Sequence, residues 1–182
     1  MKLTYLASLS LLGLAASGCA TMNQPASVSM ADEVVATADL MRGNGARVGT
    51  VELMREGGEL VVVGSLSNLP AGPHGFHLHT TGRCDAPDFQ SAGGHLNPYD
   101  RAHGKLAPQG KHLGDLDNIT VPASGMVTVR QSVGSDTAMD LARIFDTDGT
   151  AVMVHSGPDD YRTDPAGDAG SRIACGVMRR VS

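Results

Sequence analysis

The chain has 182 residues, 41% of them hydrophobic and 18% charged, which is typical of one globular domain with a substantial core. Its formal net charge of −5 argues against a general surface for nucleic acid or for anionic membranes. With 23 glycines, 9 prolines and only 3% aromatic residues, the composition favours many turns and a β structure with an aliphatic core.

Residues 1–18 have the pattern of an export signal, with a basic Lys2, an apolar run over about 6–16 and small residues before Cys19. The apolar run is well short of the roughly 20 residues that a transmembrane helix needs. Its end, AASGC, resembles a bacterial lipobox, which implies a lipid on Cys19 at the periplasmic face of a membrane. Ala20, rather than Asp, favours the outer membrane if the host has one. A cleaved signal that releases a soluble protein is the alternative.

Residues 19–31 are polar and without periodicity, which predicts a lipidated N-terminus and a flexible tether before a domain over 32–182. Loss of residues 1–18 removes one cation, Lys2, and changes the formal charge from −5 to −6. An exported chain meets an oxidising environment, in which disulfides persist. With Cys19 lipidated, Cys84 and Cys175 remain and allow one pairing; two separate buried thiols are the alternative.

Short β-branched or alternating runs, separated by turn sequences such as GNGA and EGGE, predict about eight short antiparallel strands. These runs cover residues 33–41, 47–56, 59–67, 75–79, 118–130, 151–155 and 172–178. The pattern is typical of a β-sandwich or barrel. Two stretches without strand pattern, 80–117 and 156–171, predict long functional loops, and each begins beside a histidine.

His77 and His79 are separated by one residue, so on a strand their imidazoles point to the same face and form half of a metal site. Three further histidines and an aspartate follow at spacings of eight, nine and three residues: His95, His103, His112 and Asp115. Three nitrogens and one carboxylate oxygen would complete a closed, tetrahedral zinc site of the structural type. A solvated loop with incidental histidines is the alternative.

From about Glu33 to Met178 the chain resembles the copper-zinc superoxide dismutases of the bacterial exported kind. The resemblance rests on GFHLHTTGRC, SAGGHLNP, HGKLAPQGKHLGD, VMVHSGPDD and GDAGSRIACGV, in that order. It implies a Greek-key β-barrel or sandwich that binds one copper and one zinc per chain. The implied copper ligands are His77, His79, His95 and His155, and the implied zinc ligands are His95, His103, His112 and Asp115. His95 is thus shared, while His74 matches a structural histidine outside the metal shell.

The implied reaction converts superoxide into dioxygen and hydrogen peroxide, with copper transferring electrons and His95 carrying a proton. Imidazole suits both metals, and zinc does not change its oxidation state, which agrees with this division of roles. The resemblance further implies that Asp159 joins His77 to His103, with Asp160 as the alternative occupant of that position.

Arg172 matches an arginine that faces copper and attracts the anionic substrate, and Cys84 and Cys175 match the family disulfide. Residues 161–170 contain no clear charged guiding segment. A copper-binding lipoprotein without catalysis is the alternative function, but this chain keeps the bridging histidine, the zinc ligands and the arginine. Whether the chain is a monomer or a homodimer stays open.

Overall fold

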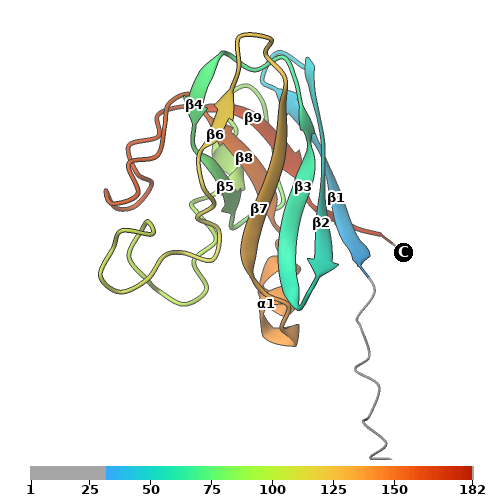
Figure 1. Cartoon of the computed structure of the whole chain (residues 1–182), viewed down its shortest axis with the longest axis vertical. Coiled ribbons are helices and arrows are strands. Elements are labelled where there is room, and N and C mark those ends of the chain that lie inside the picture. The colour runs from blue at the N-terminus through green and yellow to red at the C-terminus, as the bar shows by residue number, and fades with distance from the viewer. Residues whose placement is uncertain (1–31, 182) are drawn as a thin grey trace, which may run out of the picture.

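The structure, a computed structural model, describes residues 32–181 (Figure 1). The predicted signal peptide (1–18) and the lipidated tether (19–31) lie outside the described residues. None of the helices in the part of the chain that the structure describes has the length and apolarity needed to cross a membrane.

Eight antiparallel strands form one sheet in the order β5-β8-β9-β1-β2-β3-β7, with β10 paired to β1. Their bounds are β1 Glu33–Arg42, β2 Arg47–Glu56, β3 Glu59–Leu66, β5 Phe76–His79, β7 Val127–Ser135, β8 Ala151–His155, β9 Arg172–Val177 and β10 Arg179–Arg180. The hairpin between β2 and β3 turns at Gly57 and Gly58, which have φ of 58° and 87°. Positive φ at both positions is the requirement of a type I′ turn, whose twist matches that of the strands.

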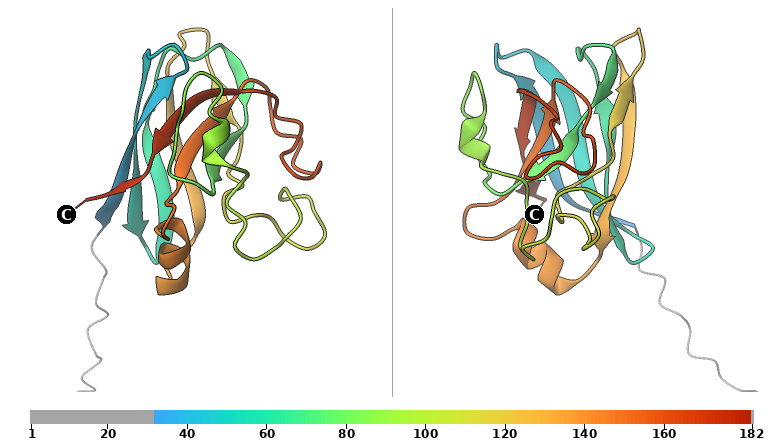
Figure 2. Two further views of the ribbon diagram at one scale, coloured as in Figure 1. Left: turned by 180° about the vertical axis from the view of Figure 1, so that it is seen from behind. Right: turned by 90° about the vertical axis from the view of Figure 1, so that its left-hand side faces the viewer.

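A second, two-stranded sheet pairs β4 (Gly72–His74) with β6 (Ile119–Val121). β4 runs into β5 after Gly75, and β6 leads into β7 through a turn at Gly125 (φ 72°). Several neighbouring strands are therefore distant in sequence, and the two sheets curl around one core (Figure 2). This arrangement confirms the predicted all-β Greek-key barrel or sandwich.

Four elements were not predicted from the sequence: β4, β10, the 3-10 helix η1 (Gln90–Ala92) and the short helix α1 (Ala138–Ile144). The signal for α1 is the N-cap Thr137, whose hydroxyl accepts from the Asp140 amide at 3.0 Å and donates to its carboxylate at 2.8 Å. This reciprocal cap satisfies a backbone N–H that the first helical turn leaves unpaired. Segments of two and three residues, such as β10 and β4, are too short to show a period.

The core is aliphatic, as the composition predicts, and Phe76 is one of the few buried aromatic side chains. A smaller cluster lies beneath the loop that follows β5. It contains Phe89, Ala92, Ala151, Met153 and Cys175. Cys175 forms a disulfide with Cys84, with a Cα–Cα distance of 5.7 Å. The predicted pairing is thus confirmed, and the alternative of two separate thiols is wrong.

Reduction of this disulfide is expected to lower the free energy of unfolding. The bond joins residues 91 positions apart, for which the loop-entropy model gives about 4–5 kcal/mol as an upper value. Urea unfolding of the metal-free domain, with and without reductant, measures the difference. A double replacement of Cys84 and Cys175 by alanine is the control, and an unchanged unfolding midpoint after reduction would contradict the expectation.

Candidate metal centre

Two long loops project from the same side of the barrel and carry most of the predicted site residues (Figure 1). The loop between β5 and β6 contains a short 3-10 helix, η1 (Gln90–Ala92), and the loop between β8 and β9 covers residues 156–171. Isolated backbone bridges join His79 to His95 and His77 to Asp115, so the first loop is held against β5. The barrel therefore fixes the position of the loop histidines.

One group of buried histidines combines β5, the end of β8 and the first loop. Its members are His77, His79, His95 and His155, which each offer a nitrogen within 4.8 Å of the others. β5 pairs antiparallel with β8, with His77 opposite Met153, and the His155 amide donates to the Gly75 carbonyl at 2.9 Å, so His155 lies two positions along the pair from His77. This is the set of four residues predicted for copper.

Hydrogen bonds decide which ring nitrogen faces the centre of this group. Nδ1 of His79 donates to the Gly93 carbonyl at 2.9 Å, and Nδ1 of His155 donates to the Gly170 carbonyl at 3.3 Å. Their Nε2 atoms are left facing each other at 3.4 Å. His77 has the opposite arrangement, since its Nε2 is bonded to a carboxylate and its buried Nδ1 has no partner within residues 32–181. Unpaired imidazole nitrogens converging in a buried space fit a nitrogen-binding metal such as copper(II).

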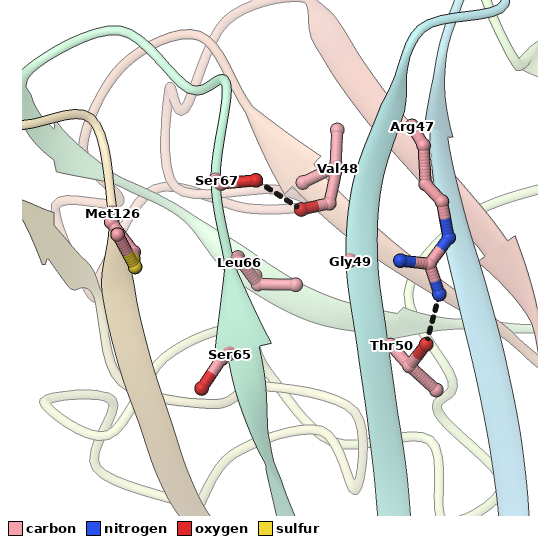
Figure 3. A pocket seen from close by; sticks show the side chains of 8 residues that line it. All are labelled: Arg47, Val48, Gly49, Thr50, Ser65, Leu66, Ser67 and Met126. Carbon is pink, nitrogen blue, oxygen red and sulfur yellow. Dashed lines mark hydrogen bonds between the residues drawn. The ribbon is translucent and has the colours of Figure 1, made fainter.

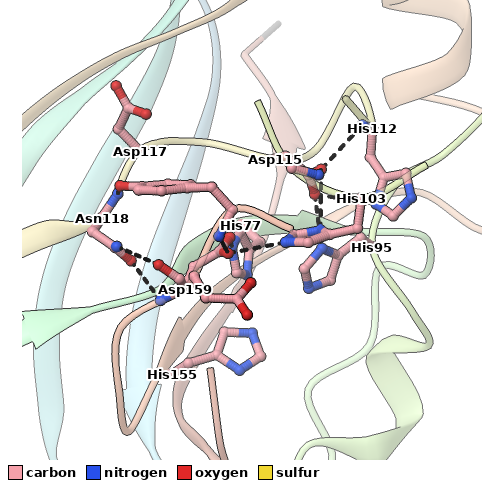
Figure 4. Close-up of polar contacts among 12 residues, drawn as sticks. His77, His95, His103, His112, Asp115, Asp117, Asn118, His155 and Asp159 are labelled. Atoms are coloured by element: carbon pink, nitrogen blue, oxygen red, sulfur yellow. Dashed lines mark hydrogen bonds and ion pairs between the residues drawn. The ribbon is translucent and has the colours of Figure 1, made fainter. Parts of the chain in front are cut away.

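The second group surrounds the carboxylate of Asp115 (Figure 4). Oδ1 of Asp115 lies 2.8 Å from Nδ1 of His95 and 3.1 Å from Nδ1 of His112, and Oδ2 lies 3.1 Å from Nδ1 of His103. The His103 nitrogen is not aligned for a hydrogen bond despite this distance. Three Nδ1 atoms and one carboxylate form a donor set that fits tetrahedral zinc.

His95 belongs to both groups. Its Nδ1 faces Asp115, whereas its buried Nε2 has no hydrogen-bond partner among the described residues and faces the other three histidines. The ring centroids of His95 and His77 are only 4.0 Å apart. One imidazole thus offers a nitrogen to each group, as a bridging ligand must.

Asp159 connects the two groups by accepting a hydrogen bond from one histidine of each (Figure 4). Its Oδ2 accepts from Nε2 of His77 at 2.8 Å, and its Oδ1 accepts from Nε2 of His103 at 2.9 Å. The neighbouring Asp160 is exposed and accepts from the amides of Arg162 and Thr163 instead. The Asp159 carboxylate fixes the tautomers of the His77 and His103 rings and so orients their ligating nitrogens.

Two residues that support Asp159 were missed by sequence reasoning. Asn118 forms a reciprocal pair with the Asp159 backbone, donating from Nδ2 to its carbonyl and accepting from its amide, both at 2.8 Å. Gly167 has φ of 65°, and a Cβ built there would lie 1.9 Å from Oδ1 of Asp159. No local sequence pattern marks either residue. Asn118 contacts Asp159 across 41 positions, and Gly167 contacts it from the other side of the same loop.

Burial favours the neutral, ligating form of the copper-group histidines. It lowers the pKa of His79 to about 2, of His155 to about 3 and of His95 to about 4. Burial also opposes protonation of His103, but the carboxylates of Asp115 and Asp159 outweigh it and raise the pKa of His103 to about 9. A cation bound by these ligands would compete with a proton on His103.

Arg172 lies at the start of β9, half-buried, with its guanidinium held by two backbone carbonyls. Nη1 donates to Phe89 at 2.7 Å and Nη2 donates to Gly93 at 2.6 Å. Phe89 adopts a left-handed conformation (φ 57°) while its side chain is buried, and this aims its carbonyl at Arg172. The Gly93 carbonyl also accepts from His79, so one peptide group anchors both the cation and a copper-group histidine.

His74 takes no part in either group. Its two ring nitrogens lie 2.9 Å from the carbonyls of His155 and Pro70, so neither is free to bind a metal. A groove of about 350 Å³ lies elsewhere, between β2, β3 and the start of β7 (Figure 3). It contains no histidine, and Arg47 at its edge is already paired with Asp39. We assign no site to it.

A Greek-key barrel that brings together a four-histidine group and a three-histidine, one-aspartate group with a shared imidazole defines a two-metal protein of the copper-zinc type. The chain belongs to the copper/zinc superoxide dismutase family, whose model matches residues 47–178. It is 41% identical over 157 residues to superoxide dismutase (Cu-Zn) 1 of Aquifex aeolicus, covering 84% of this chain and 92% of that protein.

Solved structures give the same relationship. The fold is similar to a superoxide dismutase-like protein from Bacillus subtilis, with a TM-score of 0.73 and 37% identity over 79% of this chain and 97% of that one. It is also similar to the Cu/Zn superoxide dismutase of Brucella abortus, with a TM-score of 0.65 and 27% identity over 81% of this chain and 99% of that one. The chain is thus an oxidoreductase of a family that uses copper and zinc and disproportionates superoxide.

Proposed function

We propose that this chain disproportionates superoxide at a centre in which His77, His79, His95 and His155 hold copper. In the same proposal His95, His103, His112 and Asp115 hold zinc, with one ion of each metal per chain. The observation that carries this assignment is the ring of His95, which offers Nδ1 to one group and an unpaired, buried Nε2 to the other. Bound copper supplies one-electron redox chemistry, and bound zinc supplies a fixed positive charge.

The chain's own residues supply positioning and protons. Two superoxide anions and two protons give one dioxygen and one hydrogen peroxide, so the reaction consumes two protons. Nε2 of His95 can hold one of them beside the place where peroxide forms, and solvent supplies the other. Asp115 keeps Nδ1 of His95 directed away from that place. Asp159 orients His77, and the Gly93 carbonyl orients His79, so both ligating nitrogens stay fixed.

The test measures metals and activity on the same sample. The metal-loaded domain is purified, copper and zinc are determined per chain, and superoxide disproportionation is assayed. We expect about one of each metal and a rate near the diffusional ceiling typical of such enzymes. Full occupancy without activity would instead support a copper-binding protein that does not catalyse the reaction. The elution volume during purification distinguishes a monomer from a homodimer.

Replacement of His103 tests the division between the two metals. His103→Ala is expected to lower zinc content more than copper content, because its Nδ1 faces Asp115 while its Nε2 reaches only Asp159. His112→Ala is the matched control, since His112 contacts Asp115 but not Asp159. Metal analysis after gel filtration should show zinc loss in both variants and a small additional copper loss in His103→Ala alone. Full zinc retention in His103→Ala would overturn the zinc assignment.

The disulfide supports export, because such bonds persist in oxidising compartments. The sequence AASGC and the polar segment behind it further support a lipid on Cys19 and attachment to the periplasmic face of a membrane, with the outer membrane favoured by Ala20. Mass spectrometry of the mature protein is expected to find Cys19 as a lipid-modified N-terminus. An unmodified N-terminus at another residue would remove the anchor and leave the proposed activity unaffected.

A further inference from the structure

The two cysteines of the disulfide differ in their exposure to solvent. Cys175 lies within β9, is 1% exposed, and packs in the cluster that contains Phe89 and Met153. Cys84 lies on the loop after β5 and is partly exposed. Thiol–disulfide exchange begins with attack of a thiolate on one sulfur and releases the other. The exposure of the two residues therefore favours Cys84 as the one that a thiol from solution attacks.

A groove of about 250 Å³ opens beside Cys84. Its other walls are Thr37 and Asp39 of β1 and, from the end of the chain, Val177 and Arg179. Taking about 30 Å³ for a water molecule in the liquid, this space corresponds to about eight waters, or to one small organic thiol. A thiol of that size can therefore bind in the groove in contact with Cys84.

The charges around the groove favour an anion. Asp39 is already paired, with Nη2 of Arg47 at 2.9 Å and the Thr50 hydroxyl donating to it at 2.6 Å. Arg179 is exposed and forms no ion pair with any of residues 32–181. Its neighbour Arg180 lies over the ring of Phe145, 4.4 Å from the centroid, and does not line the groove. Arg179 is therefore the uncompensated charge of this groove.

We propose that Cys84 is a thiol-exchange site, and that the groove beside it binds small anionic thiols. The incoming thiolate attacks Sγ of Cys84 and forms a new sulfur–sulfur bond. The Cys84–Cys175 bond breaks, its electron pair leaves on Sγ of Cys175, and that thiolate takes a proton from solvent. The products are a mixed disulfide on Cys84 and a free thiol on Cys175, so one disulfide replaces another without net oxidation. Exchange also frees the loop whose Phe89 and Gly93 carbonyls hold Arg172.

The position of attack is tested directly on the metal-loaded protein. It is treated with 2-mercaptoethanesulfonate, quenched with acid at early times, digested at low pH and analysed by mass spectrometry without reductant. Acid protonates the thiolates and stops further exchange. We expect the adduct on the peptide that contains Cys84 and a free thiol on the peptide that contains Cys175. Adduct mainly on Cys175, or equally on both, would overturn the proposal.

The role of Arg179 is tested with thiols of different charge. The thiolates of 2-mercaptoethanesulfonate, 2-mercaptoethanol and cysteamine are doubly negative, singly negative and net neutral. Arg179→Ala should slow exchange about fourfold with 2-mercaptoethanesulfonate and about twofold with 2-mercaptoethanol. It should leave the rate with cysteamine unchanged. Arg180→Ala makes the same change in net charge outside the groove and should leave the three rates almost unchanged. A loosened fold would speed all three reactions alike, and equal effects of the two variants would exclude a binding groove.

Discussion

Replacement of His155 by alanine is expected to remove copper and reduce the rate of superoxide disproportionation by at least about a hundredfold. His155 belongs only to the copper group, and its Nε2 faces that of His79 at 3.4 Å. Without it three histidine nitrogens remain, too few for the four-nitrogen site that suits copper(II). The zinc group comes from the loop between β5 and β6 and has no hydrogen bond to His155, so zinc should remain near one per chain.

Metal analysis and a superoxide assay on the same preparation check this result. His74→Ala is a useful control, because His74 is also a buried histidine beside β8 but both its nitrogens face carbonyls. We expect this variant to be less stable while keeping both metals when folded. If His155→Ala keeps its copper and activity, or loses zinc and copper equally, the ligand assignment is wrong.

Arg172→Ala is expected to lower the second-order rate constant for superoxide by about tenfold while both metals are retained. The substrate is an anion and the whole chain has a formal charge of −5, so any attraction must be local. A unit charge about 5 Å from the incoming anion contributes roughly 1–3 kcal/mol at intermediate dielectric, or about five- to more than a hundredfold in rate. Electrostatic steering is known in this enzyme family, and the resemblance places it on Arg172.

Further variants separate charge from geometry. Arg172→Glu should lower the rate more than Arg172→Ala, and added salt should slow the wild type more than the alanine variant. Arg172→Lys keeps the charge but cannot reproduce the paired bonds to Phe89 and Gly93, so we expect partial recovery. Full activity of Arg172→Ala with an unchanged salt dependence would exclude Arg172 as the residue that attracts substrate.

The sequence was sufficient for those parts of the site that depend on local geometry. The one-residue spacing of His77 and His79 placed both on one face of β5, because side chains alternate along a strand. The spacing from His95 to Asp115 predicted four residues that the structure brings within 4.8 Å. The resemblance then supplied His155, whose position depends on the pairing of β5 with β8 and cannot be deduced from any local run.

What could not be predicted rests mainly on backbone groups. The carbonyls of Phe89 and Gly93 hold Arg172 and His79, yet a carbonyl has no signature in the identity of its residue. Asn118 likewise contacts the backbone of Asp159 across 41 positions, at a distance in sequence where no periodicity applies. The helix α1 was missed because seven residues are too few to establish a helical period.

The two groups of ligands also differ in how much of the chain each one joins. The zinc group takes all its members from one loop, His95 to Asp115, whereas the copper group extends from His77 to His155 and requires β5 to meet β8. Closing a short loop costs less chain entropy than closing a long one and occurs earlier during folding. We therefore expect the zinc ligands to come together before the pairing of β5 with β8 adds His155 to the copper ligands. On this expectation, a newly made chain completes its zinc ligands before its copper ligands.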